Sequence, residues 1–254
     1  MSSYTVFGIR TGIIREGDDL AGALVRAVKG SEAGPFCSGD ILVVAESAVA
    51  TAEGRVVQLA GVIPSEESEQ VAERYSMDPR VVEVVIRESD SVVGGIPGFL
   101  VCMKGGTLLP NAGVDASNAP PGCLVLLPAD PDQSARTIRR EIESHTATRV
   151  GVIIADSRTH AMRAGCSGVA IGCSGFPAVV DLRGRSDLFG RRLEVTKQAL
   201  ADNLASAAEV VMGEADESIP AAVIRGLGIP LGDFEGVEAI DAEGCLFMGL
   251  LKRT

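Results

Sequence analysis

The chain has 254 residues, 46% hydrophobic and 22% charged, which is enough to bury a sizeable core and excludes wholesale disorder. Its formal net charge of -11 argues against a non-specific nucleic-acid binder or a membrane-surface protein, because both classes need basic surface. The first residues lack the basic start and apolar run of a targeting segment. The six cysteines include no Cys-x-x-Cys pair, so we expect reduced thiols and a cytoplasmic location.

Apolar runs and aspartate caps define most of the expected elements in chain order. The runs that predict buried strands cover residues 40–45, 99–103, 123–127 and 150–155. The expected helix starts are Asp18 or Asp19, Asp78-Pro79 and Asp130-Pro131. The longest helix is expected from about Val195 to Met212. This mixture is too irregular for a βαβ array, and no composition break divides residues 1–254.

A short internal repeat marks the region between 165 and 175. Gly165-Cys-Ser-Gly168 recurs as Gly172-Cys-Ser-Gly175 on either side of three apolar residues. The repeat predicts two tight turns around a short strand. The alternative interpretation is a pair of backbone nests that present N–H groups to an anion.

The sequence contains no P-loop, no dinucleotide-binding glycine motif and no serine triad. The candidate functional groups that remain are side-chain oxygens that could bind a metal. The polar segment 111–118 offers Asp115 and Asn118, and Asp156-Ser157 follows an apolar strand directly. A carboxylate and a hydroxyl at a strand end suit a hard cation such as Mg²⁺. The alternative role for such an aspartate is a helix cap or turn former.

Charged residues form two further groups near the predicted long helix. Asp202, Glu209 and Asp216 recur every seven residues, which indicates a solvated acidic face if the helix continues. Glu214 follows Gly213, a helix breaker, and is the better candidate to point into a site. Arginines between 181 and 197 indicate either an anionic substrate or surface ion pairs.

The sequence resembles the coenzyme F420-0:L-glutamate ligase (gamma-glutamyl ligase) family from about residue 6 to residue 230. The matching motifs occur in the family's order along the chain. They include Glu16-Gly-Asp-Asp19, Gly39-Asp-Ile-Leu-Val-Val44, Ala52-Glu-Gly-Arg55, Asp78-Pro-Arg80, Asn111-Ala-Gly-Val-Asp-Ala-Ser-Asn118, Val150-Gly-Val-Ile-Ile-Ala-Asp156, Asp187-Leu-Phe-Gly190, Met212-Gly-Glu214 and Ile224-Arg-Gly-Leu227.

The resemblance implies a two-lobed α+β fold, a single ligase-like domain and an intertwined homodimer. It also implies GTP as co-substrate, Mg²⁺ or Mn²⁺, and a monovalent cation such as K⁺. The implied reaction joins L-glutamate through its amine to the terminal carboxylate of coenzyme F420-0, through an acyl-phosphate. GTP is converted to GDP and phosphate.

Site residues carry over from the family position by position. The implied metal ligands are Asp115, Asp156, Ser157 and Glu214, with Glu214 at a second metal. The implied nucleotide-binding residues are Ile9, Arg10, Thr11, Gly12, Glu46, Ser47, Thr51, Asn118, Val211, Met212, Gly213, Glu214, Ala215, Asp216, Glu217 and Ser218. The implied catalytic residues are Asp115, Asp156, Arg158 and His160.

Three positions depart from the family's usual pattern. Thr51 stands where a lysine near the phosphates is usual, and Arg158-Thr159-His160 replaces a segment that normally ends in Gly-Arg. Arg10-Thr11-Gly12 replaces the usual glycine–proline turn. Two alternatives therefore stay open: a paralogue that ligates an amino acid to another carboxylate, and a non-catalytic ligand-binding paralogue.

Overall fold

The structure, a computed structural model, describes residues 3–248 and contains both helices and sheets, which confirms the predicted α+β class. The chain divides into two compact units. The first unit comprises the chain up to Gly54 together with Pro128–Val237. The second comprises Arg55–Leu127 and the C-terminal residues from Glu238.

A five-stranded sheet forms the centre of the first unit, in the order β1-β12-β2-β8-β9. The strands are β1 (Thr5–Ile9), β12 (Ala221–Arg225), β2 (Ile41–Ala45), β8 (Gly151–Thr159) and β9 (Cys166–Ser174). Only β2 and β8 are parallel neighbours, and the other three pairs are antiparallel.

Helices cover both faces of this sheet. On one face, α1 (Leu20–Gly30) and α5 (Pro131–Thr146) pack against Leu42, Val44, Val152 and Ile154. On the other face, α6 (Leu200–Met212) packs against Ile41, Val43 and Ile153. A strand buried on both faces must be apolar at every position, which explains the uninterrupted run in β2.

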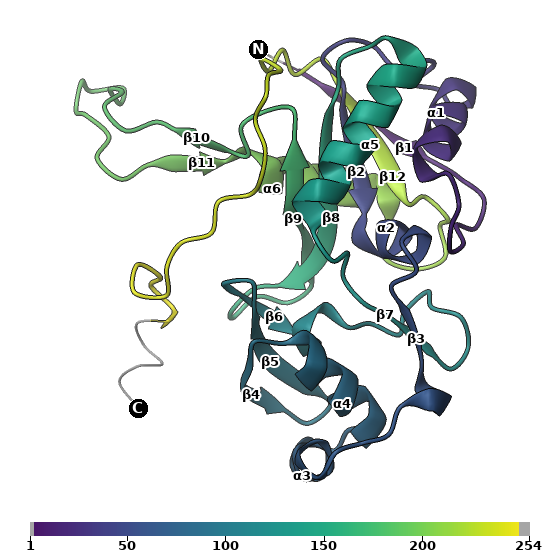
Figure 1. The fold of residues 1–254 in the computed structure, drawn as a ribbon. Helices are drawn as coiled ribbons and strands as arrows, with labels where there is room; N and C mark the ends of the chain where they lie inside the picture. The colour runs from purple at the N-terminus through teal and green to yellow at the C-terminus, as the bar shows by residue number, and fades with distance from the viewer. Residues whose placement is uncertain (1–2, 249–254) are drawn as a thin grey trace. The chain divides into compact units, whose positions relative to one another are not determined.

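Two smaller parts complete the first unit. Helix α2 (Glu46–Ala52) follows β2 directly and buries Val49 among the residues on the α1 face. The strands β10 (Val179–Asp181) and β11 (Lys197–Ala199) pair with each other and form the base of a long hairpin. Figure 1 shows this hairpin running out from the first unit's sheet, and we call residues 179–199 the arm.

The glycine repeat lies along β9, which is one continuous strand and not the short strand that we predicted. A Cβ at Gly168 would come within 2.6 Å of the Ala205 backbone in α6. A Cβ at Gly172 would lie 2.2 Å from the Pro131 carbonyl oxygen at the start of α5. These glycines therefore let two helices approach the strand closely.

Two backbone amides of the repeat, those of Gly168 and Cys173, already donate hydrogen bonds within the protein and are not available to an anion. The Cys173 amide donates to the Asp132 carboxylate at 2.9 Å, and the Gly168 amide donates to the carboxyl group of Glu209. Both donors are therefore already bound inside the first unit. The nest interpretation is not supported for these two amides.

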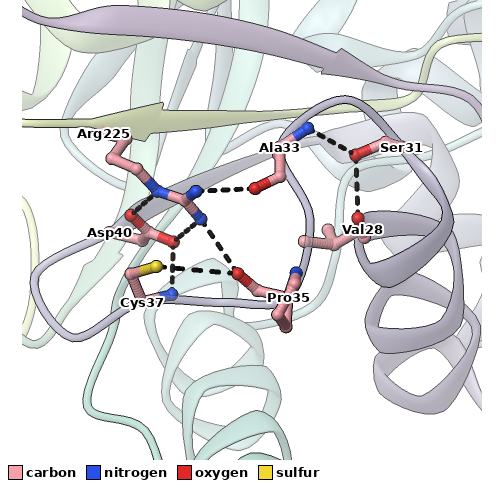
Figure 2. Close-up of polar contacts among 7 residues, drawn as sticks. All are labelled: Val28, Ser31, Ala33, Pro35, Cys37, Asp40 and Arg225. Atoms are coloured by element: carbon pink, nitrogen blue, oxygen red, sulfur yellow. Dashed lines mark hydrogen bonds and ion pairs between the residues drawn. The ribbon is translucent and has the colours of Figure 1, made fainter.

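A nearly buried ion pair closes the end of the sheet where β12 finishes (Figure 2). Arg225 donates from Nε and Nη2 to the two carboxylate oxygens of Asp40, at 2.8 and 2.7 Å. Its remaining donors reach the carbonyl oxygens of Ala33 and Pro35, while the Cys37 amide donates to Asp40. Asp40 is only 1% exposed, so the guanidinium and the amide compensate its buried charge. The network ties the loop before β2 to β12.

The second unit contains a three-stranded antiparallel sheet, two helices and a short strand pair. The sheet consists of β4 (Ser91–Ile96), β5 (Phe99–Lys104) and β6 (Thr107–Pro110). The helices are α3 (Glu66–Tyr75) and α4 (Pro79–Glu88), and the pair is β3 (Val56–Gln58) with β7 (Cys123–Val125). The 3₁₀ turns are η1 (Leu59–Gly61) and η2 (Asn111–Gly113). Val82, Val85, Leu100 and Leu124 contribute to its core.

The capped helices are confirmed, and the longest predicted helix is wrong. Asp19, Asp78 and Asp130 each accept a hydrogen bond from a backbone amide in the first turn of α1, α4 and α5. The helix expected from Val195 begins only at Leu200, because residues 197–199 pair with β10. At 16 residues, α5 is longer than the 13-residue α6.

Candidate functional site

Strand register brings four of the predicted segments to one edge of the first unit's sheet. Ile9 at the end of β1 pairs with Ala221 at the start of β12, and Ala221 pairs with Val44. Ala45 at the end of β2 pairs with Ala155 of β8. The residues that follow or precede these positions are therefore neighbours: 10–12, 46–47, 156–158 and 213–220.

The N-terminal turn contributes mainly backbone and exposed side chains to this edge. The side chain of Ile9 is fully buried in the core, which leaves its backbone as the part that can face a nucleotide. Arg10 and Gly12 are exposed and Thr11 is partly exposed. A Cβ on Gly8 would come 3.2 Å from the Val211 carbonyl oxygen and 3.1 Å from the Ile219 side chain. Glycine there keeps β1 close to the end of α6.

The segment after α6 is an exposed loop that turns back toward β12. Helix α6 ends at Met212, and Gly213 takes a positive φ of 78°. Met212 is buried, Val211 is partly buried, and Gly213 to Ser218 are exposed. Glu217 accepts a hydrogen bond from the Ala215 amide at 2.8 Å, which lowers the pKa of Glu217. Asp216 lies beyond the helix, so the predicted acidic face with Asp202 and Glu209 does not form.

Two carboxyl groups at the end of α6 share a hydrogen bond. Burial, the hydrogen bond and charge of Glu214, and the charge of Asp156 raise the pKa of Glu209 to about 7. Burial and the charges of Glu214, Glu209 and Asp156 also raise the pKa of the Cys166 thiol. The charges of Glu214 and Asp156 therefore both act on Glu209.

Strand β8 continues through Asp156 and Ser157, so these residues do not lie in a loop as we predicted. Side chains alternate along a strand, and Ile153 and Ala155 pack on the α6 side. Alternation then places Ser157 on the α6 side and Asp156 on the opposite side. Asp156 accepts a hydrogen bond from Arg158 Nε at 2.9 Å.

His160 lies just beyond the end of β8 and is exposed. Its Nε2 atom is 2.7 Å from the hydroxyl oxygen of Ser167, which lies on β9. This pair holds the imidazole beside the hairpin that joins β8 and β9. His160 is therefore close in the chain to Asp156, and its imidazole contacts Ser167.

The donor chemistry of this edge fits a hard divalent cation. Asp156, Ser157 and Glu214 offer carboxylate and hydroxyl oxygens, and burial together with the hydrogen bond and charge of Glu214 and the charge of Asp156 raises the pKa of Glu209. Within residues 3–248, no three His, Cys, Asp or Glu side chains are arranged as a ready metal cluster. Mg²⁺ needs no such cluster, because one or two carboxylates commonly hold it together with water and substrate phosphates.

Asp115 and Asn118 belong to the second unit, in the loop that follows η2. The backbone of Asp115 pairs with Val125, and Ser117 donates to the Asp115 carboxylate at 3.1 Å. Asn118 has a positive φ of 54°, which agrees with the predicted turn-forming segment. The first unit alone therefore does not bring these two residues to Asp156, and their joint role stays a prediction.

Thr51 lies in α2, and the arginines between 181 and 197 lie in the arm. Thr51 lies in the last turn of α2, at the other end of this helix from Glu46 and Ser47. In the arm, Arg183 Nη2 lies 2.6 Å from Asp181 Oδ2, and both side chains are about half exposed. The ion-pair interpretation therefore holds for Arg183.

Sequence patterns missed the role of Glu209. The seven-residue spacing connected it with Asp202 and Asp216, whereas its actual partner is Glu214 beyond the helix end. Asp202 instead accepts a hydrogen bond from the Ala170 amide at 3.0 Å and ties α6 to β9. The helix breaker at Gly213 was the available signal, since it lets the chain fold Glu214 back onto the last turn.

Comparison with known proteins gives matches over most of the chain. A family model described as F420-0:gamma-glutamyl ligase matches residues 8–226. The protein named coenzyme F420:L-glutamate ligase from Methanopyrus kandleri is 47% identical over 224 residues, covering 88% of this chain and 86% of its own. Proteins of the same name from Methanocaldococcus jannaschii and Archaeoglobus fulgidus are 45% and 44% identical, over 81% and 85% of this chain and 83% and 85% of their own.

None of the helices that the structure describes is long and apolar enough to cross a membrane. The family match runs from the end of β1 through β12 and includes every segment that meets at the sheet edge, as well as Asp115 and Asn118. The relatives cover most of this chain at well over a third identity. The chain belongs to the F420-0:gamma-glutamyl ligase family.

Proposed function

We propose that this protein is a GTP-dependent and divalent-metal-dependent ligase that adds L-glutamate to the terminal carboxylate of coenzyme F420-0. The observation that carries this proposal is the meeting of segments 10–12, 46–47, 156–158 and 213–220 at one sheet edge. These are the segments that family resemblance assigns to nucleotide and metal, and relatives of up to 47% identity bear the name of this ligase.

The chemistry requires activation of a carboxylate. A carboxylate oxygen is a poor leaving group, so the γ-phosphoryl group of GTP first moves onto it, giving an acyl-phosphate and GDP. The glutamate amine then attacks the carbonyl carbon, the C–O bond to phosphate breaks, and the amine gives up a proton. Because phosphoryl transfer depends mostly on positioning and charge neutralisation, oxygen ligands and cations are the residues that it needs.

The first unit supplies donors on both sides of β8. Asp156 would hold one divalent cation, and the resemblance implies a metal-binding role for Asp115 as well. Ser157 and Glu214 would hold the second, since alternation places Ser157 on the α6 side. Bound Mg²⁺ or Mn²⁺ neutralises phosphate charge, which also explains how a chain of net charge -11 accepts a triphosphate.

Arginines take the place of the family's usual phosphate lysine. Thr51 has no charge, whereas Arg10 is exposed at the end of β1 and Arg158 lies two residues beyond Asp156. A guanidinium can bridge two phosphate oxygens, so either residue can supply the missing cation. Val211 to Ser218 and Glu46-Ser47 would surround the nucleotide, and K⁺ is the monovalent cation that we expect.

A homodimer is the assembly that we propose. The arm exposes Leu188 and Phe189, which are 98% and 89% exposed, next to several arginines. Large apolar side chains at the tip of a protruding hairpin are typical of an association surface. The basic arm also complements the acidic remainder of a second copy.

The direct test is to incubate the purified protein with GTP, Mn²⁺, L-glutamate and F420-0, and to measure products by mass spectrometry. We expect one glutamate mass added per GDP formed in the first turnover, and no product after chelation of the metal. Product with a different carboxylate from a panel, and none with F420-0, would identify the paralogue alternative. Thr51, where the family usually has a lysine, is the observation that keeps the non-catalytic alternative open. GTP binding without any product would identify the non-catalytic one.

A further inference from the structure

Arg158 and Asp156 form an ion pair within the proposed site. Arg158 Nε donates to Asp156 Oδ2 at 2.9 Å, and the side chains are 13% and 15% exposed. The two residues are two positions apart on β8, so their side chains lie on the same side of the strand. Their low exposure makes this contact more significant than an exposed surface pair.

The guanidinium lies in an acidic environment. Glu209 of α6 is hydrogen-bonded to Glu214, and the charge of Asp156, on the opposite side of β8, also acts on Glu209. A positive charge that contacts Asp156 reduces the repulsion among these carboxylates. A divalent cation at Asp156 would do the same from a similar position, and it would repel the guanidinium.

We propose that Arg158 holds Asp156 while no metal is bound, and that a divalent cation at Asp156 displaces the guanidinium toward the nucleotide phosphates. This inference rests on the proposed function, because it takes Asp156 to be a metal ligand. Arg158 is then a positioning residue for the metal and a contact for the triphosphate. Metal binding and phosphate recognition become coupled through one side chain.

If Arg158 moves from Asp156 to the phosphates, its removal should strengthen Mn²⁺ binding and weaken GTP binding. A purely structural role for Arg158 would not change the two affinities in opposite directions. In Arg158→Gln, Mn²⁺ alone should bind about fivefold more tightly, because no cation competes for Asp156. GTP at saturating Mn²⁺ should bind about tenfold more weakly, because a charge-assisted contact is lost. Mn²⁺ binding is measured from the electron paramagnetic resonance signal of the free ion, and GTP binding by calorimetry without an acceptor.

Three further variants complete the test. Arg158→Lys keeps the charge and should leave Mn²⁺ affinity within about twofold of the parent. Arg80→Gln is the matched control, because Arg80 also pairs with an aspartate two residues away, Asp78, at 2.6 Å. It should change neither affinity. Asp156→Asn should lose at least about tenfold in Mn²⁺ affinity, since a ligand carboxylate is removed.

The possible results distinguish the proposed exchange at Arg158 from the proposed metal site at Asp156. If Asp156→Asn weakens Mn²⁺ binding but Arg158→Gln leaves it unchanged or weakens it, the exchange is wrong and the metal site stands. If Asp156→Asn leaves Mn²⁺ binding unchanged, both the exchange and the proposed metal site are wrong. Tighter Mn²⁺ binding with unchanged GTP affinity in Arg158→Gln would overturn the displacement toward the phosphates.

Discussion

Asp156 contacts Arg158 and lies near the end of β8, where the carboxyl ends of two parallel strands meet. We expect Asp156→Ala and Asp115→Ala each to reduce turnover by about 10³-fold or more, because lost charge neutralisation costs several kcal/mol in the transition state. Turnover is measured as ligated product at saturating Mn²⁺. Circular dichroism checks that each variant is folded.

Glu141→Ala is the control for these two variants, since Glu141 is an exposed carboxylate on α5. It should retain parental turnover. Near-normal turnover in either aspartate variant would show that the residue concerned is not a metal ligand.

Arg225 has a structural role at the opposite end of the same sheet, although it lies within a family motif. Arg225→Ala should lower the free energy of unfolding by about 3–5 kcal/mol, because it leaves Asp40 buried and without its guanidinium. Denaturant unfolding of the parent and the variant measures this difference. The double variant Asp40→Ala/Arg225→Ala should lose less free energy of unfolding than the two single variants lose together. Losses that simply add would contradict coupling between the two residues.

At the scale of elements, close helix–strand approach depends on the glycines of β9. Gly172→Ala should lower the free energy of unfolding by about 1–3 kcal/mol, because the new methyl group would meet the Pro131 carbonyl oxygen. Gly30→Ala is the matched control, since a Cβ at this position in α1 meets nothing within 4 Å. It should be neutral or stabilising by up to about 1 kcal/mol. Equal effects of the two substitutions would show that the approach at Gly172 is not tight.

Glu83 on α4 accepts hydrogen bonds from Ser65, the residue that caps α3. We expect this contact to make the stability of the second unit depend on pH. Glu83 accepts hydrogen bonds from the Ser65 amide and hydroxyl, and then from Arg87, which lower its pKa from 4.5 to about 2. A lowered pKa means that the folded chain favours the carboxylate. The stabilisation is therefore complete above pH 4.5 and is lost as the pH falls toward about 2.

Glu83→Gln tests this dependence. The free energy of unfolding should fall clearly at neutral pH, and the difference from the parent should shrink as the pH falls from 4.5 toward 2. Urea unfolding at a series of pH values measures it. Glu73→Gln, an exposed change on α3, should have little effect at neutral pH. A Glu83→Gln difference that does not vary with pH would rule out the carboxylate as the cause.

At the scale of the whole molecule, the arm provides the proposed contact between two copies. Leu188→Asp combined with Phe189→Asp should convert a dimer into a single chain, because two charges cannot be buried against a partner without cost. Light scattering at micromolar concentration measures the mass. Leu188→Met should remain dimeric. A parent protein with the mass of one chain would contradict the homodimer outright.

Local sequence signals predicted the helix starts and three of the four buried strands, whereas β5 exposes Phe99 and Val101. Aspartate caps act within one helical turn, and strands such as β2 are apolar at every position because both faces are covered. The error at residues 195–199 has a non-local cause. Those residues pair with 179–181 across the arm, and a window along the chain does not contain their partners.

The residues proposed for the site come from ordered family motifs, which extend over most of the sequence. Their arrangement was not predicted. Asp156 was expected in a loop and lies in β8, and Glu209 was expected on a solvated face and is hydrogen-bonded to Glu214. Strand length depends on the neighbouring strand, and the fold of Glu214 onto α6 depends on the backbone turn at Gly213.

The sequence by itself determined the family, the acidic balance, the capped helices and the choice of oxygen donors, because each of these depends on residue identity and short spacing. Only the tertiary structure decided that segments 10–12, 46–47, 156–158 and 213–220 meet at one sheet edge, and that Arg158 contacts Asp156. The physical reason is that strand order and register join residues more than a hundred positions apart through backbone hydrogen bonds, which residue identity alone does not specify.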